Sequence, residues 1–197
     1  MHRRRFLVAA SSVAGLAAIA RPSAALTPEE ARAHVRDAVD AVLELVKSDA
    51  GTGEKAERLR KIFDRVAAMP QIARFAAGVA WRDMSQPQQS RFTEAFVQYL
   101  SRSYARRFQE YSGGSVEVDG ATDAGRRGLL VKTTVVQPDA EPVKVEWMVS
   151  DRPGRIVIAD IIIEGVSLLI TQREEISAML EKRNGNIDKL IADLASA

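Results

Sequence analysis

Apolar residues recur three or four positions apart along the first part of the chain, the spacing typical of amphipathic helices. This pattern predicts one helix over residues 27–49 and a second over residues 54–68, with a short third helix that begins at Pro70. Thr27 and Glu30 form a capping box where the first helix starts. The first part of the chain is therefore predicted to be helical, with the apolar stripe of its first helix formed by Val35, Val39, Val42 and Val46.

A long helix rich in aromatic residues is predicted next. Ser85 and Gln88 form a second capping box, and the helix that follows can run to Tyr111, about 39 Å at 1.5 Å per residue. Its apolar arc covers about half of the circumference, so it can pack on a sheet and still offer apolar surface to something else. The arc consists of Phe92, Phe96, Tyr99, Leu100, Tyr104, Phe108 and Tyr111.

After residue 114 the period of the apolar residues changes to two, which indicates strands with one buried face. Four strands are predicted, over residues 115–118, 128–137, 143–150 and 155–164, and the short links between them favour an antiparallel meander. Helical spacing returns over residues 171–182 and 187–194. Helices, then a sheet, then helices predict an α+β fold with a helical N-terminal half, a four-stranded antiparallel meander and C-terminal helices.

The N-terminus has the composition of a cleaved export signal. Three arginines at 3–5 precede an apolar stretch over residues 6–20, and the small residues 23–25 form a cleavage site, so we expect cleavage after Ala25 and a single domain over residues 26–197. The run Arg3 to Leu7 also fits a twin-arginine signal, and the sequence leaves this route and the general secretory route open. Both predict a protein of the periplasm.

Export changes the charge of the chain. The full sequence carries 28 basic and 26 acidic residues. Loss of the four arginines before residue 26 leaves 24 basic residues and a net charge of about −2. The strong basic field that nucleic-acid binding requires is therefore not expected in the mature chain.

Few residues suit catalysis or metal binding. The sequence has no cysteine, and His34 is the one histidine left after cleavage, so neither a metal site nor a cofactor is predicted. We interpret His34 as a surface residue of the first helix. Asp160 interrupts an apolar strand and is the best candidate for a general base on a cone-shaped α+β fold. Strict alternation places Asp160 with Ile158 and Ile162, on the face opposite the inner one, which argues against that role.

The segment from Ile161 to Leu168, an isoleucine run that ends in Glu-Gly-Val-Ser-Leu and is closely followed by Gln172 and Arg173, resembles the end of the last strand in the MlaC family. This family comprises periplasmic phospholipid carriers, also known as toluene-tolerance proteins. Further matches in the same order cover nearly the whole mature chain; they are Trp81, Phe92, Phe96, Tyr104 and the turn Tyr111-Ser112-Gly113.

The resemblance implies a carrier that encloses acyl chains in an apolar cavity between the sheet and the helices. It implies two protein partners, an inner-membrane ABC transporter with MCE domains and an outer-membrane lipoprotein complex. The cargo it implies is a phospholipid or, as in a branch of the family associated with hopanoid biosynthesis, another apolar lipid. Carried over by position, the lining candidates are Phe92, Phe96, Tyr99, Leu100, Val131, Val145, Trp147, Val149, Ile161, Ile163, Val166 and Leu169.

Two other hypotheses remain open at the level of the sequence. One is a small-molecule enzyme on a cone-shaped fold, and the other is a protein-interaction module that binds through a helical face. A lipid carrier has a simple physical basis, because exposing a C16 acyl chain to water costs about 12 kcal/mol. A dry cavity removes this cost without any catalytic group.

Overall fold

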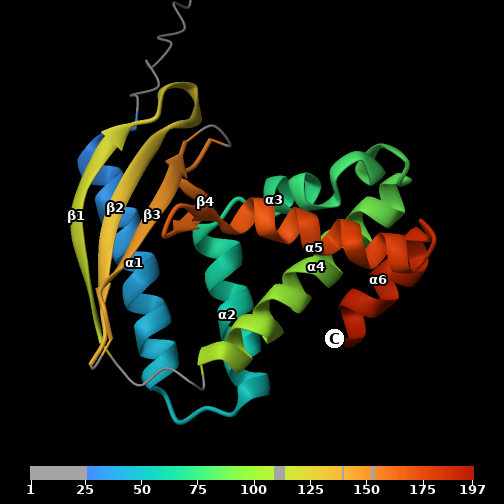
Figure 1. The fold of residues 1–197 in the computed structure, drawn as a ribbon, viewed down its shortest axis with the longest axis horizontal. Coiled ribbons are helices and arrows are strands. Elements are labelled where there is room, and N and C mark those ends of the chain that lie inside the picture. The colour runs from blue at the N-terminus through green and yellow to red at the C-terminus, as the bar shows by residue number, and fades with distance from the viewer. Residues whose placement is uncertain (1–25, 109–113, 139, 152–153) are drawn as a thin grey trace, which may run out of the picture.

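The computed structural model describes residues 26–108, 114–138, 140–151 and 154–197 (Figure 1). Four helical segments come first: α1 (Pro28–Lys47), α2 (Thr52–Val66), α3 (Met69–Ala77) with the 3₁₀ turn η1 (Gly78–Arg82), and α4 (Gln86–Arg107). A sheet follows, with strands β1 (Ser115–Asp123), β2 (Leu129–Val136), β3 (Val143–Ser150), β4 (Val157–Ile163) and β5 (Val166–Ser167), and a 3₁₀ turn η3 (Gly125–Arg127) between β1 and β2. Helices α5 (Leu168–Lys182) and α6 (Ile187–Ser196) complete the fold.

The α+β prediction is confirmed. The sheet is an antiparallel meander in the order β1-β2-β3-β4-β5, so it has five strands where four were predicted. The additional strand is only two residues long, which is too short for an alternation pattern to reveal. β1 extends to Asp123, five residues beyond the prediction, because a register shift between Val118 and Gly120 lets pairing continue past the glycine.

Local signals fixed the helix starts. Thr27 and Ser85 accept hydrogen bonds from the backbone N–H groups of Glu30 and Gln88, and both capping boxes are complete. The last position of the predicted aromatic arc, Tyr111, lies outside the described residues, as does the expected export signal.

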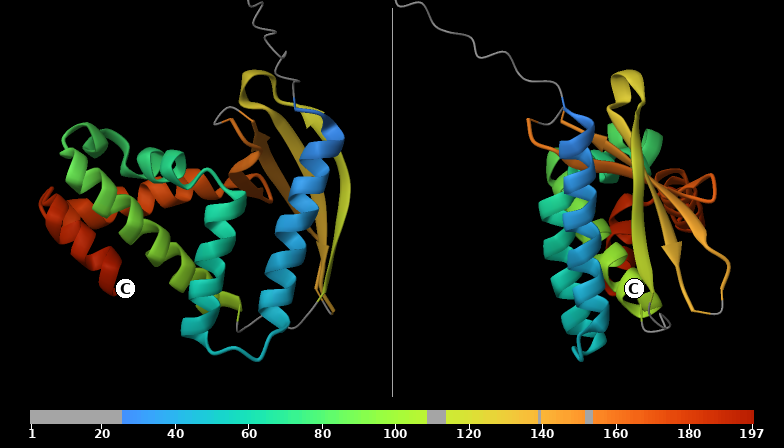
Figure 2. Two further views of the ribbon diagram at one scale, coloured as in Figure 1. Left: turned by 180° about the vertical axis from the view of Figure 1, so that it is seen from behind. Right: turned by 90° about the vertical axis from the view of Figure 1, so that its left-hand side faces the viewer.

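Two regions bury apolar side chains (Figure 2). At one end, α1 lies across one face of the sheet, and α2 runs beside it. At the other end, α3, α4, α5 and α6 pack on one another in a bundle beside the β4 edge of the sheet, which we call the helical core. Its central side chains are fully buried: Phe92, Phe96, Ile176, Leu190 and Leu194.

Two side chains tie α2 to the rest of the fold. Arg155 donates to the carbonyls of Asp64, Arg65 and Ala67, which closes the C-terminal end of α2. His34 was predicted to lie on the surface, but it is half-buried, and its Nε2 lies 2.9 Å from the carbonyl oxygen of Val66. It faces inward because α2 covers this side of α1. Within the described residues, no helix is both long and apolar enough to cross a bilayer.

Candidate functional site

A cavity of about 460 Å³ lies between the sheet and the helices. Its walls come from the second half of α1, one stripe of α2, the start of α3, the last turns of α4, strands β1 to β4 and the start of α5. Among the 29 residues that line it, Gln137, Asp160 and Gln172 are polar, and Tyr104 and Trp147 each carry one polar atom. All the others are apolar.

The cavity exists because α1 packs on the sheet along only part of its length. From its start to its middle, Ala31, Val35 and Val39 are buried against Leu129, Val131 and Val149 of the sheet. In its second half Val42, Leu43 and Val46 line the cavity and are only half-buried. One face of the sheet is therefore closed at one end and open to a cavity at the other.

A bulge in β4 decides which of its side chains face the cavity. Val145 pairs with Ile163 and Trp147 with Ile161, but the register shifts after Met148, and Val149 pairs with Ile158. Residues paired across neighbouring strands share a face, so Ile158, Ile161 and Ile163 lie with Val145, Trp147 and Val149. Strict alternation predicts that Ile158 lies with Asp160 on the opposite face, and the bulge at Ala159 makes that prediction wrong for Ile158.

Asp160 lies at the bulge, on the rim of the cavity. Its Oδ1 accepts hydrogen bonds from the backbone N–H groups of Ile161 (2.8 Å) and Leu169 (3.0 Å), and its Oδ2 accepts one from the Ser167 hydroxyl (2.6 Å). Ser167 in turn is the N-cap of α5. The Asp160 carboxylate thus joins β4 to the start of α5, and three donors already occupy it.

Two aromatic side chains on the cavity wall, Tyr104 and Trp147, each carry one polar atom. Trp147 donates from Nε1 to the Thr133 hydroxyl (2.9 Å), and Thr133 donates to the Val145 carbonyl (3.0 Å). Tyr104 packs edge-on against Phe63, and burial raises the pKa of its phenol. A phenol held in this way stays neutral at neutral pH. The cavity therefore offers an apolar, uncharged lining over most of its surface.

The structure brings six of the twelve predicted lining residues to the cavity: Leu100, Val145, Trp147, Ile161, Ile163 and Leu169. The other six lie elsewhere. Phe92 and Phe96 stack on each other in the helical core, at 5.9 Å between ring centroids, and Tyr99 hydrogen-bonds Glu175. Val131 and Val149 are buried under α1, and Val166 is 59% exposed on β5.

Both α1 and α2 contribute to this wall, which was not predicted from the sequence. Val42, Leu43, Ile62, Phe63 and Val66 all line the cavity. The sequence shows apolar stripes at helical spacing in both helices, but a stripe does not reveal what faces it.

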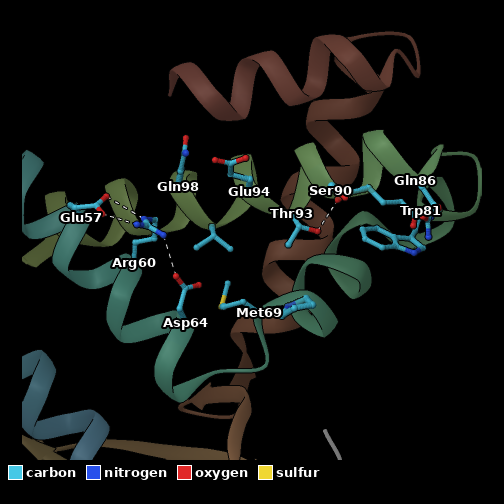
Figure 3. A pocket seen from close by; sticks show the side chains of 13 residues that line it. Glu57, Arg60, Asp64, Met69, Trp81, Gln86, Ser90, Thr93, Glu94 and Gln98 are labelled. Carbon is cyan, nitrogen blue, oxygen red and sulfur yellow. Dashed lines mark hydrogen bonds and ion pairs between the residues drawn. The ribbon is translucent and has the colours of Figure 1, made fainter.

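A second hollow, of about 730 Å³, lies on the other side of α2, between α2 and α4 (Figure 3). Arg60 projects from α2 between Glu57 and Asp64 and forms ion pairs with both, at 2.7 and 3.2 Å. These contacts lower the pKa of Glu57 and raise that of Arg60. The other residues of this second hollow that Figure 3 labels are mostly polar, so it suits acyl chains far less than the cavity under the sheet.

The antiparallel sheet and the helices that cover one of its faces leave an apolar cavity between them, and the chemistry of this cavity suits an apolar ligand. The model of the MlaC protein family matches residues 36–196, and this chain belongs to that family. Among solved structures it is similar to the phospholipid-binding protein from Ralstonia solanacearum, whose structure is in complex with a phospholipid. The two are 26% identical with a TM-score of 0.66, and the match covers 84% of this chain and 98% of the other.

Proposed function

We propose that this protein is a lipid carrier that encloses the acyl chains of a phospholipid in the cavity between the sheet and α1, α2 and α4. The apolar lining of that cavity carries the proposal. Burial of each methylene contributes about 0.8 kcal/mol, so a lining without charged groups over most of its area is what acyl chains require. The phospholipid bound by the related Ralstonia protein supports the same ligand class.

The proposal extends to a wider role, which family membership supports. We place the carrier in the periplasm, where it moves phospholipid between an outer-membrane lipoprotein complex and an inner-membrane ABC transporter with MCE domains. A hopanoid or a similar apolar lipid would satisfy the same cavity. N-terminal sequencing of the protein from a periplasmic extract tests the location, and we expect the sequence to begin at Leu26.

Native mass spectrometry of protein purified from its own host tests the binding function. We expect a mass increase of one phospholipid per chain, and extraction with organic solvent should identify it. A protein that is empty in the native spectrum and takes up no phospholipid from vesicles would contradict the proposal. An exposed apolar face with no lipid would instead favour the interaction module.

The enzyme alternative depends on Asp160, and the hydrogen bonds of its carboxylate favour a structural role. Asp160→Asn should weaken the junction between β4 and α5 and lower the free energy of unfolding by about 1 to 3 kcal/mol. The folded variant should still bind phospholipid with the same stoichiometry. Loss of a chemical turnover of the bound lipid in this variant, with binding retained, would restore the enzyme hypothesis.

A further inference from the structure

Thr133 places a hydroxyl on the inner face of the sheet, where its neighbours are apolar. It pairs with Val145 across the strands, and the inner-face residues next to it on β2 are Val131 and Val135. Only 1% of Thr133 is exposed. A buried hydroxyl lowers stability unless hydrogen bonds satisfy it, and a valine side chain has the same shape without that cost. A threonine at this position therefore needs an explanation.

The hydrogen bonds of Thr133 supply one. Its hydroxyl has a single hydrogen, which it donates to the Val145 carbonyl (3.0 Å). The lone pairs of the hydroxyl are then left for the indole N–H of Trp147, which donates to it at 2.9 Å. An indole N–H can only donate, and the side chains that flank Trp147 across the strands, Val131 and Ile161, offer no acceptor. Thr133 is therefore the acceptor that the indole requires on this face.

The same hydrogen bond fixes where the indole lies. Trp147 forms one row across the sheet with Val131 and Ile161, whereas Thr133 and Val145 belong to the next row, toward the open end of the inner face. To reach Thr133, the indole must extend from its own row over the next one. Thr133 is fully buried and is not among the residues that line the cavity, whereas Trp147 lines it. This is the result expected when the indole covers the threonine.

Trp147 thus stands at the border between the closed and the open end of the inner face. Two residues further along β3, Val149 is packed under α1, and two residues earlier Val145 lines the cavity. Trp147 itself packs against the residues buried under α1. An acyl chain that runs along the sheet from the open end therefore meets the indole where the space beneath β2 and β3 ends.

We propose that Trp147 limits how far an acyl chain extends along the sheet, and that Thr133 is the positioning residue that holds the indole in place. This inference rests on the proposed function and adds a preference for chain length. Without the hydroxyl, the indole N–H has no partner on the sheet, so the ring turns into the cavity and takes space from the chains. Without the indole, that space is open and longer chains fit.

Competition between lipids that differ only in chain length tests this preference. Delipidated mature protein is incubated with vesicles that contain equal amounts of dimyristoleoyl, dipalmitoleoyl and dioleoyl phosphatidylglycerol. Native mass spectrometry then gives the share of each lipid bound. Each variant is compared with the wild type, which removes differences in how readily the lipids leave the vesicles.

Four variants separate the hydroxyl, the indole and general stability. Thr133→Val removes the hydroxyl and keeps the shape of the side chain, Thr133→Ser keeps the hydroxyl, and Trp147→Leu removes the indole. Thr134→Val is the matched control, because Thr134 lies on the outer face of the same strand and donates its hydroxyl to Asp119 (2.8 Å).

We expect Thr133→Val to shift the bound lipid toward shorter chains and Trp147→Leu to shift it toward longer ones, by about fourfold for each methylene that loses or gains its place in the cavity. Thr133→Ser and Thr134→Val should keep the wild-type distribution. If Thr133→Val or Trp147→Leu keeps it as well, the inference is wrong. Equal shifts in Thr133→Val and in either Thr133→Ser or Thr134→Val also overturn it, because the hydroxyl on the inner face would then not be the cause.

Fluorescence of the indole gives a readout that needs no lipid. The sequence has two tryptophans, so Trp81→Phe leaves Trp147 as the single emitter. In this background we expect the slow depolarisation of a fixed ring, faster depolarisation when Thr133→Val is added, and the slow value again with Thr133→Ser. If Thr133→Val does not fold, a mobile indole in the Trp81→Phe protein overturns the inference equally.

The two proposals fail in different ways. A wild type that binds none of the three lipids contradicts the proposed function, and the inference falls with it. A wild type that binds them, with a distribution of chain lengths that is the same in Trp147→Leu, contradicts the inference alone.

Discussion

The helical core and the cavity under the sheet are built from the same kinds of side chain, yet one is filled and the other is hollow. In the helical core, Phe92 and Phe96 of α4 meet Leu190 and Leu194 of α6, and all four are fully buried. In the next two turns of α4, Leu100 and Tyr104 face the cavity. The difference lies in the partner: α6 packs on α4 at one end, and at the other end no helix of the described residues fills the cavity beneath the sheet.

This contrast shows that apolar surface on a helix does not by itself distinguish a binding site from a core. Close packing stabilises the helical core, because each side chain there fills space completely. Side chains that line the cavity make fewer packing contacts, because one side of each borders open space. Mutations of matched size should therefore have different effects in the two regions.

The largest effect is expected from Phe96→Ala in the helical core. Removal of a fully buried ring that stacks on Phe92 should lower the free energy of unfolding by about 3 to 5 kcal/mol. Phe63→Ala, on the cavity wall, is the matched control and should cost less than half as much, since that ring already borders open space. Urea denaturation measures both. Equal losses would mean that the cavity is packed as tightly as the core.

A neighbouring pair on β3 gives the next largest effect. Val145 lines the cavity, whereas Val149, on the same face of the strand, is buried under α1. Val149→Trp should overpack and cost about 1 to 3 kcal/mol or more. Val145→Trp should leave the thermal midpoint nearly unchanged and displace the lipid. If Val145→Trp destabilises the protein as much as Val149→Trp does, and no lipid is found in the wild type, then Val145 belongs to an ordinary core.

The smallest effect is expected at the junction of the two regions, where the Tyr99 hydroxyl donates to Glu175 and Glu175 also accepts from Gln172 of the cavity wall. Burial and the contact with Glu175 raise the pKa of Tyr99 above its ordinary value of about 10. The fold therefore favours the neutral phenol, and the stability that this contributes is complete below pH 10 and is lost as the pH rises through the raised pKa.

Tyr99→Phe should lower the free energy of unfolding by about 1 kcal/mol at neutral pH and weaken its decline above pH 10. Denaturation at pH 7 to 11 measures this. Tyr104 titrates in both proteins, so their difference isolates Tyr99. If the free energy of unfolding of the variant falls above pH 10 as steeply as that of the wild type, Tyr99 does not contribute to this pH dependence.

Much of the fold could be predicted because its signals are local. The capping boxes at Thr27 and Ser85 fixed two helix starts, and alternation fixed the bounds of β3 at Val143 and Ser150. The site was predicted less well, because the role of Phe92 and Phe96 depends on α6, about 90 residues further along the chain. No local pattern in the sequence of α4 predicts the contact between these two residues and α6.

The bulge at Ala159 divides β4 into two parts, and the inward-facing residues have even numbers in the first part and odd numbers in the second. Before the bulge the even-numbered residue Ile158 faces the inner side of the sheet, and its bridge to Ala67 at the end of α2 holds it there. After the bulge the odd-numbered residues Ile161 and Ile163 face the same side. A one-residue insertion or deletion at this point would therefore be absorbed by the backbone, and the side chains on both sides would keep their faces. Aligning related sequences by alternation alone would swap inside for outside over half of the strand.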